Sequence, residues 1–271
     1  MLTDAIRSEA YRLWRNRSAR FWGFAFIPVA LLVFNLALDT YLRVRLNTGV
    51  GVDLGLQILR ALGAVGSPYL QVFYAIGAAA IFAGDYRWET WRLIAMRNSR
   101  TNLLLGKFIV YGTACGLSLL GLALMGVAHT FYGGLLAHTF PALPSPGFVV
   151  TTLAMFGTSW IELMLVGAIV ALVAVSTRAM MGAALVAVMF GLMQSAALTQ
   201  MSLAPSLMKL ALVPRFAAET LGAFVSHREV GPDFYIGASD GALAALCLVV
   251  WITVLGAITL LVFQRQNLSR E

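Results

Sequence analysis

The chain has 271 residues, of which 60% are hydrophobic and 11% are charged, and its formal net charge is +7 at pH 7. A soluble globular protein carries roughly 25% charged residues, so this composition excludes a water-soluble protein and indicates an integral membrane protein. The surplus of Lys and Arg lies in short stretches beside apolar segments, where these residues act as topology signals. We therefore expect no nucleic-acid partner. Cys115 and Cys247 both lie within apolar segments, which excludes a disulfide framework.

The first 20 residues combine apolar and basic side chains on different faces of one expected helix. Leu2, Ile6 and Leu13 recur at helical spacing, and arginines occupy the other faces. We expect residues 1–20 to form an amphipathic helix at the membrane interface, with a disordered basic tail as the alternative. The apolar run that follows is longer than the core of a signal peptide, so we interpret it as a retained transmembrane helix.

Six apolar segments are long enough to cross about 30 Å of hydrocarbon. They are residues 21–38, 68–84, 104–131, 149–175, 180–199 and 241–264. An even number places both termini on one side, and basic residues favour that side about two to one, which identifies it as the cytoplasm. The sequence therefore predicts an all-α integral membrane protein with one transmembrane domain over residues 1–271 and both termini in the cytoplasm.

Two segments on the opposite side are longer than simple turns. Within residues 40–67, Leu54, Ile58, Leu62 and Val65 indicate a short amphipathic helix near the outer interface. Residues 200–240 are too apolar for a free loop, and prolines interrupt them too often for another span. We expect a hairpin of two short helices that dips into the outer leaflet.

The stretch "GDYRWETWRLIAMRNSRTNLLLGK", residues 84–107, places charges and tryptophans between two apolar spans. If it is helical, Asp85, Glu89 and Arg92 form one charged stripe beside the two tryptophans. Ser99 or Thr101 is suited to cap the next helix. From the residues alone, the stretch is either an ordinary positive loop with aromatic anchors or a surface for a partner protein.

This stretch resembles the connection between the second and third helices of ABC-2 type transporter permeases, the membrane subunits of bacterial ATP-driven exporters. Asp85 matches the acidic residue of the family pattern, Thr90 its threonine, Arg100 its arginine, and Gly106–Lys107 the pair that opens the third helix. The sequence departs from the pattern where Glu89 replaces a glycine, and the proline before the arginine is missing.

The resemblance implies that residues 85–100 form a coupling helix that docks on a separate ATPase subunit. The residues expected to make or support this contact are Asp85, Glu89, Thr90, Arg92, Arg97, Arg100 and Lys107. The chain itself is not expected to be an enzyme, because "LLLGKF" lacks the first glycine and the Ser or Thr of a phosphate-binding loop. ATP and magnesium would bind to the partner ATPase, and this chain would hold no cofactor.

The implied function is a permease of the bacterial cytoplasmic (inner) membrane, formed as a homodimer or with a related chain. It would export or flip an amphiphilic molecule, such as a lipid, glycan, peptide or drug-like compound, by alternating access. The alternatives are a structural membrane subunit that transports nothing and a proton-coupled secondary transporter that uses Glu162.

Glu162 is the one acidic residue deep within an expected span, and intramembrane carboxylates often mark functional sites. It is expected either to face a transport pathway, as a cation ligand or proton carrier, or to be a packing group satisfied by Ser159 or Thr158. Asn35 and Gln194 are interpreted as interhelical hydrogen-bonding groups or as contacts to cargo. The three histidines, His129, His138 and His227, are scattered over different segments, so we expect no metal site.

Overall fold

The computed structural model describes residues 2–46, 53–87, 98–141, 146–201, 204–226 and 236–266. Within these ranges the chain is helical and contains no β-strand, which confirms the all-α prediction. The helices, in chain order, are α1 (Leu2–Arg15), α2 (Arg17–Arg20), α3 (Phe26–Leu46), α4 (Leu54–Gly63), α5 (Pro68–Arg87), α7 (Arg100–Ala137), α8 (Phe148–Thr177), α9 (Met180–Gln200), α10 (Leu207–Leu212), α11 (Pro214–Val225) and α12 (Ala238–Arg265). A π-helical turn, Phe21–Ala25, joins α2 to α3, and a 3₁₀ turn, Ala64–Gly66, follows α4.

Five helices in the described ranges are long and apolar enough to cross a membrane. They are Arg17–Leu42, Arg100–Ala137, Phe148–Thr177, Met180–Gln200 and Ala238–Arg265. The pair Leu54–Gly66 and Pro68–Tyr86 is bent by 66° and supplies a sixth crossing if it counts as one span. The chain is therefore a multi-pass membrane protein by length and composition.

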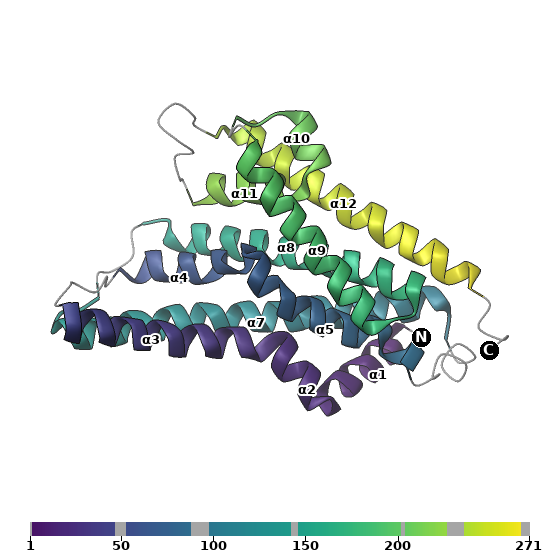
Figure 1. The fold of residues 1–271 in the computed structure, drawn as a ribbon, viewed down its shortest axis with the longest axis horizontal. Helices are drawn as coiled ribbons and strands as arrows, with labels where there is room; N and C mark the ends of the chain where they lie inside the picture. Colours follow the sequence, from purple (N-terminus) through teal and green to yellow (C-terminus); the bar gives the residue numbers. More distant parts are fainter. Residues whose placement is uncertain are drawn as a thin grey trace.

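The helices run between two ends of an elongated bundle (Figure 1). One end, called here the basic end, contains α1, the end of α5, the start of α7, the α8–α9 junction and the end of α12. Side-chain contacts join these parts: Tyr86 Oη donates to Gln266 Oε1 at 3.0 Å, and Gln266 Nε2 donates to the Val175 carbonyl. At the opposite end, Thr40 on α3 meets Tyr132 on α7 at 2.5 Å. The N-terminal helix therefore lies at the same end as the end of the last helix.

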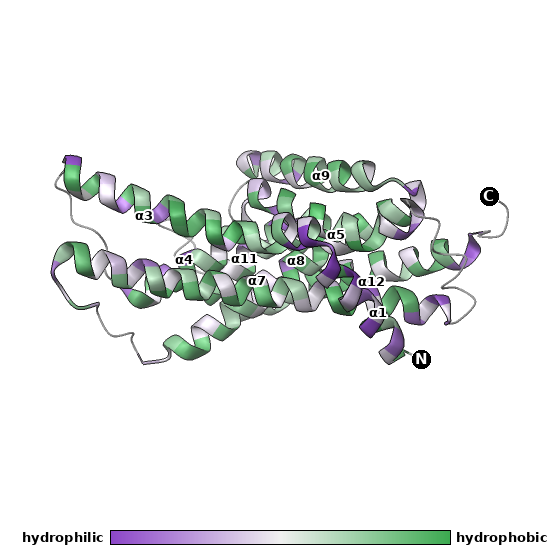
Figure 2. Cartoon of the chain, turned by 90° about the horizontal axis from the view of Figure 1, so that it is seen from below, coloured by the Kyte–Doolittle hydropathy of each residue, from purple (hydrophilic) through white to green (hydrophobic). Residues whose placement is uncertain are grey.

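The long helices and the N-terminal helix differ in hydropathy. The long helices α7, α8 and α9 are mostly hydrophobic, whereas α1 carries many hydrophilic residues (Figure 2). Large apolar side chains remain exposed along the long helices, including Leu117, Leu124, Leu135, Val149, Leu153, Leu185, Met193, Leu246 and Val250. So much apolar surface is unfavourable in water but suits contact with lipid chains.

Glycines bring the helices together closely. A Cβ on Gly23, in the π-helical turn, would lie 2.5 Å from Gly77 Cα on α5, and a Cβ on Gly167 of α8 would lie 2.2 Å from the Tyr111 ring on α7. Tyr111 is fully buried, and its hydroxyl donates to the Leu163 carbonyl at 2.9 Å. Such small-residue contacts are typical of helix packing in membranes, where dispersion and hydrogen bonds replace the hydrophobic effect.

Helices and a cap are present at several positions where the sequence predicts them. Residues 2–15 are helical, Ser99 caps α7 by accepting a hydrogen bond from the Asn102 amide, and two short helices, α10 and α11, lie within 200–240. The helix predicted in residues 40–67 is also present as α4. Its apolar residues Ile58 and Leu62 are buried, because α4 packs against α7 and α8.

Candidate functional site

Four charged side chains form a buried cluster at the basic end, called here the ion cluster. It consists of Glu9 and Arg12 from α1, Asp85 from α5 and Lys107 from α7. Lys107 Nζ lies 2.7 Å from Asp85 Oδ2 and 3.1 Å from Glu9 Oε2. Arg12 pairs with Glu9 at 3.0 Å and makes a short contact with Asp85. The cluster thus joins three helices that are far apart in the sequence.

Three of the four side chains of the ion cluster are almost fully buried. Asp85 and Lys107 are each 1% exposed, and Glu9 is 5% exposed. The Lys107 ammonium donates to the Ile81 carbonyl at 2.6 Å as well as to Glu9, in addition to its ion pair with Asp85. Burial alone would lower the pKa of Arg12, but the hydrogen bond and charge of Asp85 outweigh it and raise that pKa above its ordinary value. The cluster contains two acids and two bases, so its formal charges balance.

Asp85 was expected to contact a separate ATPase, and Lys107 was expected to make or support that contact. Both side chains are buried inside the chain, where they bind each other and α1 and so hold α5 and α7 together. Arg100 is similarly engaged: its guanidinium donates to the carbonyls of Phe263, Gln264 and Gln266 at the end of α12.

The other four residues of the expected coupling surface, Glu89, Thr90, Arg92 and Arg97, lie outside the described residues. The sequence analysis missed Glu9 and Arg12. The signal for Glu9 was present, because Glu9 falls on the same helical face as Ile6 and Leu13. An acidic residue on an apolar face requires a buried partner.

A second polar cluster surrounds Glu162, midway along α8. Arg215 Nη1, on α11, lies 2.5 Å from Glu162 Oε1, and Gln71 Nε2, on α5, donates to the same oxygen at 2.9 Å. Arg215 Nη2 also pairs with Glu219 at 2.5 Å, and the Arg215 amide donates to Gln194 Oε1 at 2.8 Å. This Glu162 cluster therefore joins α5, α8, α9 and α11.

The structure brings together two of the three residues considered as pathway contacts. Glu162 and Gln194 meet through Arg215, whereas Asn35 lies on α3 and is not part of the Glu162 cluster. Ser159 and Thr158 do not satisfy Glu162, because their hydroxyls donate to the carbonyls of Leu62 and Ala154. Arg215 lies within residues 200–240, which were expected on the outer side, and an arginine directly after Pro214 among apolar residues is the signal that could have identified it.

No metal site accompanies these clusters in the described ranges, where no group of three or more His, Cys, Asp or Glu residues could hold an ion. His129 instead pairs with Asp39 at 2.7 Å, which links α7 to α3. His227 lies outside the described residues.

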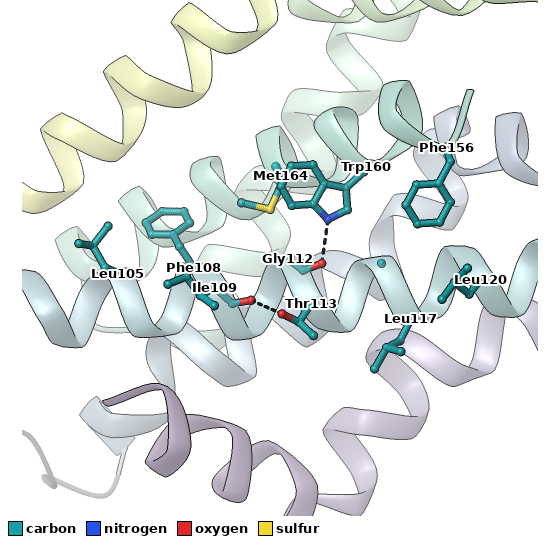
Figure 3. A pocket seen from close by; sticks show the side chains of 11 residues that line it. Leu105, Phe108, Ile109, Gly112, Thr113, Leu117, Leu120, Phe156, Trp160 and Met164 are labelled. Carbon is teal, nitrogen blue, oxygen red and sulfur yellow. Dashed lines mark hydrogen bonds between the residues drawn. The ribbon is translucent and has the colours of Figure 1, made fainter. Parts of the chain in front are cut away.

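An apolar groove of about 530 Å³ opens between α7 and α8 (Figure 3). Trp160 spans it, and its indole N–H donates to the Gly112 carbonyl at 2.8 Å. The hydroxyl of Thr113 is bound to the Ile109 carbonyl. With its polar groups already engaged, the groove suits hydrocarbon and carries no chemistry of its own.

Comparison of the sequence with protein-family models and with curated proteins gives no match. The geometry of the ion cluster and of the Glu162 cluster is therefore the basis for the function proposed below.

Proposed function

We propose that this chain is the membrane-spanning permease subunit of an ABC-2 type exporter. In this proposal the bent pair α4–α5 counts as one span, giving six, and the basic end faces the cytoplasm of a bacterium. Two permease subunits form a pathway for an amphiphilic molecule, and a separate ATPase docks on residues 85–100. The observation that carries the proposal is the ion cluster, which ties both helices flanking that segment to α1.

The ion cluster supports a coupling role because it holds together the helices on both sides of residues 85–100. Lys107 on α7 pairs with Asp85 on α5. From α1, Glu9 pairs with Lys107 and Arg12 pairs with Asp85. Arg100 connects the start of α7 to the end of α12. A displacement of the connection between α5 and α7 would therefore move α1, α5, α7 and α12 together.

The driving force is a difference in contact between two states. An ATPase can shift the permease only if it binds one arrangement of the bundle better than the other. Of the charged residues expected at the coupling surface, Glu89, Arg92 and Arg97 are left for that contact, since Asp85, Lys107 and Arg100 are engaged within the chain. Thr90 lies between them in the sequence.

The test is reversal of the partner-facing charges with Arg92→Glu and Arg97→Glu together. Like charges across a docked interface weaken association, so the variant should insert normally but lose co-purification with a Walker-motif ATPase and lose cargo-stimulated ATP hydrolysis. Reversal of Arg43 and Arg45, at the opposite end of the bundle, is the matched control and should change neither.

The competing functions give different results. A structural membrane subunit would show no ATPase partner and no transport in the unmodified chain. A proton-coupled carrier would transport without an ATPase and would stop with Glu162→Gln. Retention of the ATPase and of coupled activity after the double reversal at Arg92 and Arg97 would refute the coupling role.

A further inference from the structure

A cavity of about 880 Å³ lies between α4, α8 and α11, next to the Glu162 cluster. This volume falls within the range of small-molecule sites, about 300–1,000 Å³. The walls are largely apolar and include Leu56, Leu59, Met155, Leu198, Phe216 and Ile236. Charged side chains reach it from three positions: Glu162, Glu219 and Arg60. An apolar space with a few charged groups selects amphiphilic ligands.

One carboxylate oxygen in this cavity lacks a partner. Both hydrogen bonds to Glu162, from Gln71 and from Arg215, go to Oε1, and no described residue binds Oε2. Glu162 is 8% exposed and lines the cavity. Because Oε2 accepts no hydrogen bond from the described residues, it can accept one from a ligand bound in the cavity.

Gly66 keeps the space beside this oxygen open. A Cβ at Gly66 would lie 3.5 Å from Glu162 Oε2 and 3.4 Å from both terminal nitrogens of Arg215. A larger residue would therefore cover the oxygen. The backbone of Gly66 is helical, with no positive φ, so a Cβ at this position would change the space beside Oε2 without straining the backbone.

Arg215 is shared between two carboxylates. Its guanidinium contacts Glu162 and Glu219, both at 2.5 Å. Glu219 is 54% exposed and Arg60 is exposed on α4 at the cavity edge, so solvent screens both of these charges. Because Arg215 divides its hydrogen bonds between two carboxylates, Glu162 is incompletely compensated, which favours a cationic donor beside it.

We propose that this cavity binds a cationic amphiphile, a molecule with an apolar body and one protonated amine. The ammonium donates to Glu162 Oε2 beside Gly66, and the apolar body contacts the side chains of α4, α8 and α11. The identification of such a molecule as the exported cargo rests on the proposed permease function, whereas the binding site itself depends only on this cavity.

The test measures binding of dansylcadaverine, a primary amine on a fluorescent apolar body, to the purified full-length chain in detergent. Its N-acetyl derivative has nearly the same body without the charge and controls for partition into micelles. The amine should bind at least about tenfold more tightly than the acetylated probe, as a charge-assisted hydrogen bond predicts. Equal affinities would overturn the proposal.

Three variants locate the contact. Glu162→Gln should weaken amine binding about tenfold and leave binding of the acetylated probe unchanged. Gly66→Ala should weaken amine binding severalfold without altering any charge, and its contacts of 3.4–3.5 Å allow the fold to persist. Asp53→Asn removes a carboxylate from the N-cap of α4 outside the cavity, with Asn an equally good cap, and should have no effect.

The variants also guard against misfolding and separate the two proposals. If Glu162→Gln lowers the thermal midpoint of the chain, Gly66→Ala decides, and unchanged amine binding in that variant would refute the site. The assay contains no ATPase. Equal binding of the amine and its acetylated derivative would therefore overturn the cation site without affecting the permease proposal. Absence of an ATPase partner would overturn the permease proposal without affecting the cation site.

Discussion

Substitution of Lys107 by methionine should destabilise the protein strongly. The ammonium of Lys107 binds Asp85, Glu9 and the Ile81 carbonyl, and it is 1% exposed. Methionine fills much of the same volume but leaves two buried carboxylates that share Arg12 alone. Breaking a buried ion network by removing one partner costs about 3–5 kcal/mol. We expect a loss of that size in the free energy of unfolding, measured by SDS-driven unfolding in mixed micelles with far-UV circular dichroism.

A double-mutant cycle tests whether this cost arises from the ion cluster. Asp85→Asn alone should also cost about 3–5 kcal/mol. The double variant removes one charge of each sign and leaves Glu9 paired with Arg12, so it should lose less than the sum of the single losses, with a coupling of about 1–3 kcal/mol. Arg17→Gln, at an exposed arginine of α2, is the control and should change stability by less than about 0.5 kcal/mol. Additive losses, or a silent Lys107→Met, would show that the cluster does not hold the three helices together.

Two further predictions concern topology and packing. With single cysteines in a Cys-free background, an impermeant maleimide applied to intact cells should label Ser226→Cys and spare Asn98→Cys; labelling at Asn98 would contradict cytoplasmic placement of the basic end. Gly167→Ala should cost about 1–3 kcal/mol in the same unfolding assay, because its methyl group would meet the buried Tyr111 ring at 2.2 Å. Gly84→Ala, where a Cβ meets no atom within 4 Å, should be neutral or stabilising by about 0.4–1 kcal/mol, and equal losses at the two glycines would refute the packing argument.

The local features of this protein follow from its sequence because short-range physics decides them. Apolar segments of sufficient length predict membrane helices, and the described long helices occupy the expected segments. Their ends differ where helices extend past the apolar core: α3 continues to Leu46, whereas the apolar pattern ended at residue 38, and α7 spans Arg100–Ala137, whereas the pattern indicated residues 104–131. Ser99 is another local feature, since a cap depends only on the next few residues.

The partners of the buried charges were decided by tertiary structure. Glu9 and Lys107 are 98 residues apart, and Arg215 lies 53 residues beyond Glu162. Nothing in the spacing of these residues favours one pairing over another, because helix periodicity sets only which face a residue occupies. The packing of small residues, such as Gly23 on Gly77, sets which faces meet. The sequence by itself therefore determined a multi-pass helical protein with a basic end and an unusual intramembrane carboxylate. Only the tertiary structure determined that Asp85 and Lys107 are buried and bind residues of the same chain. The reason is that long-range helix packing, and not the local pattern, sets the partner of a buried charge.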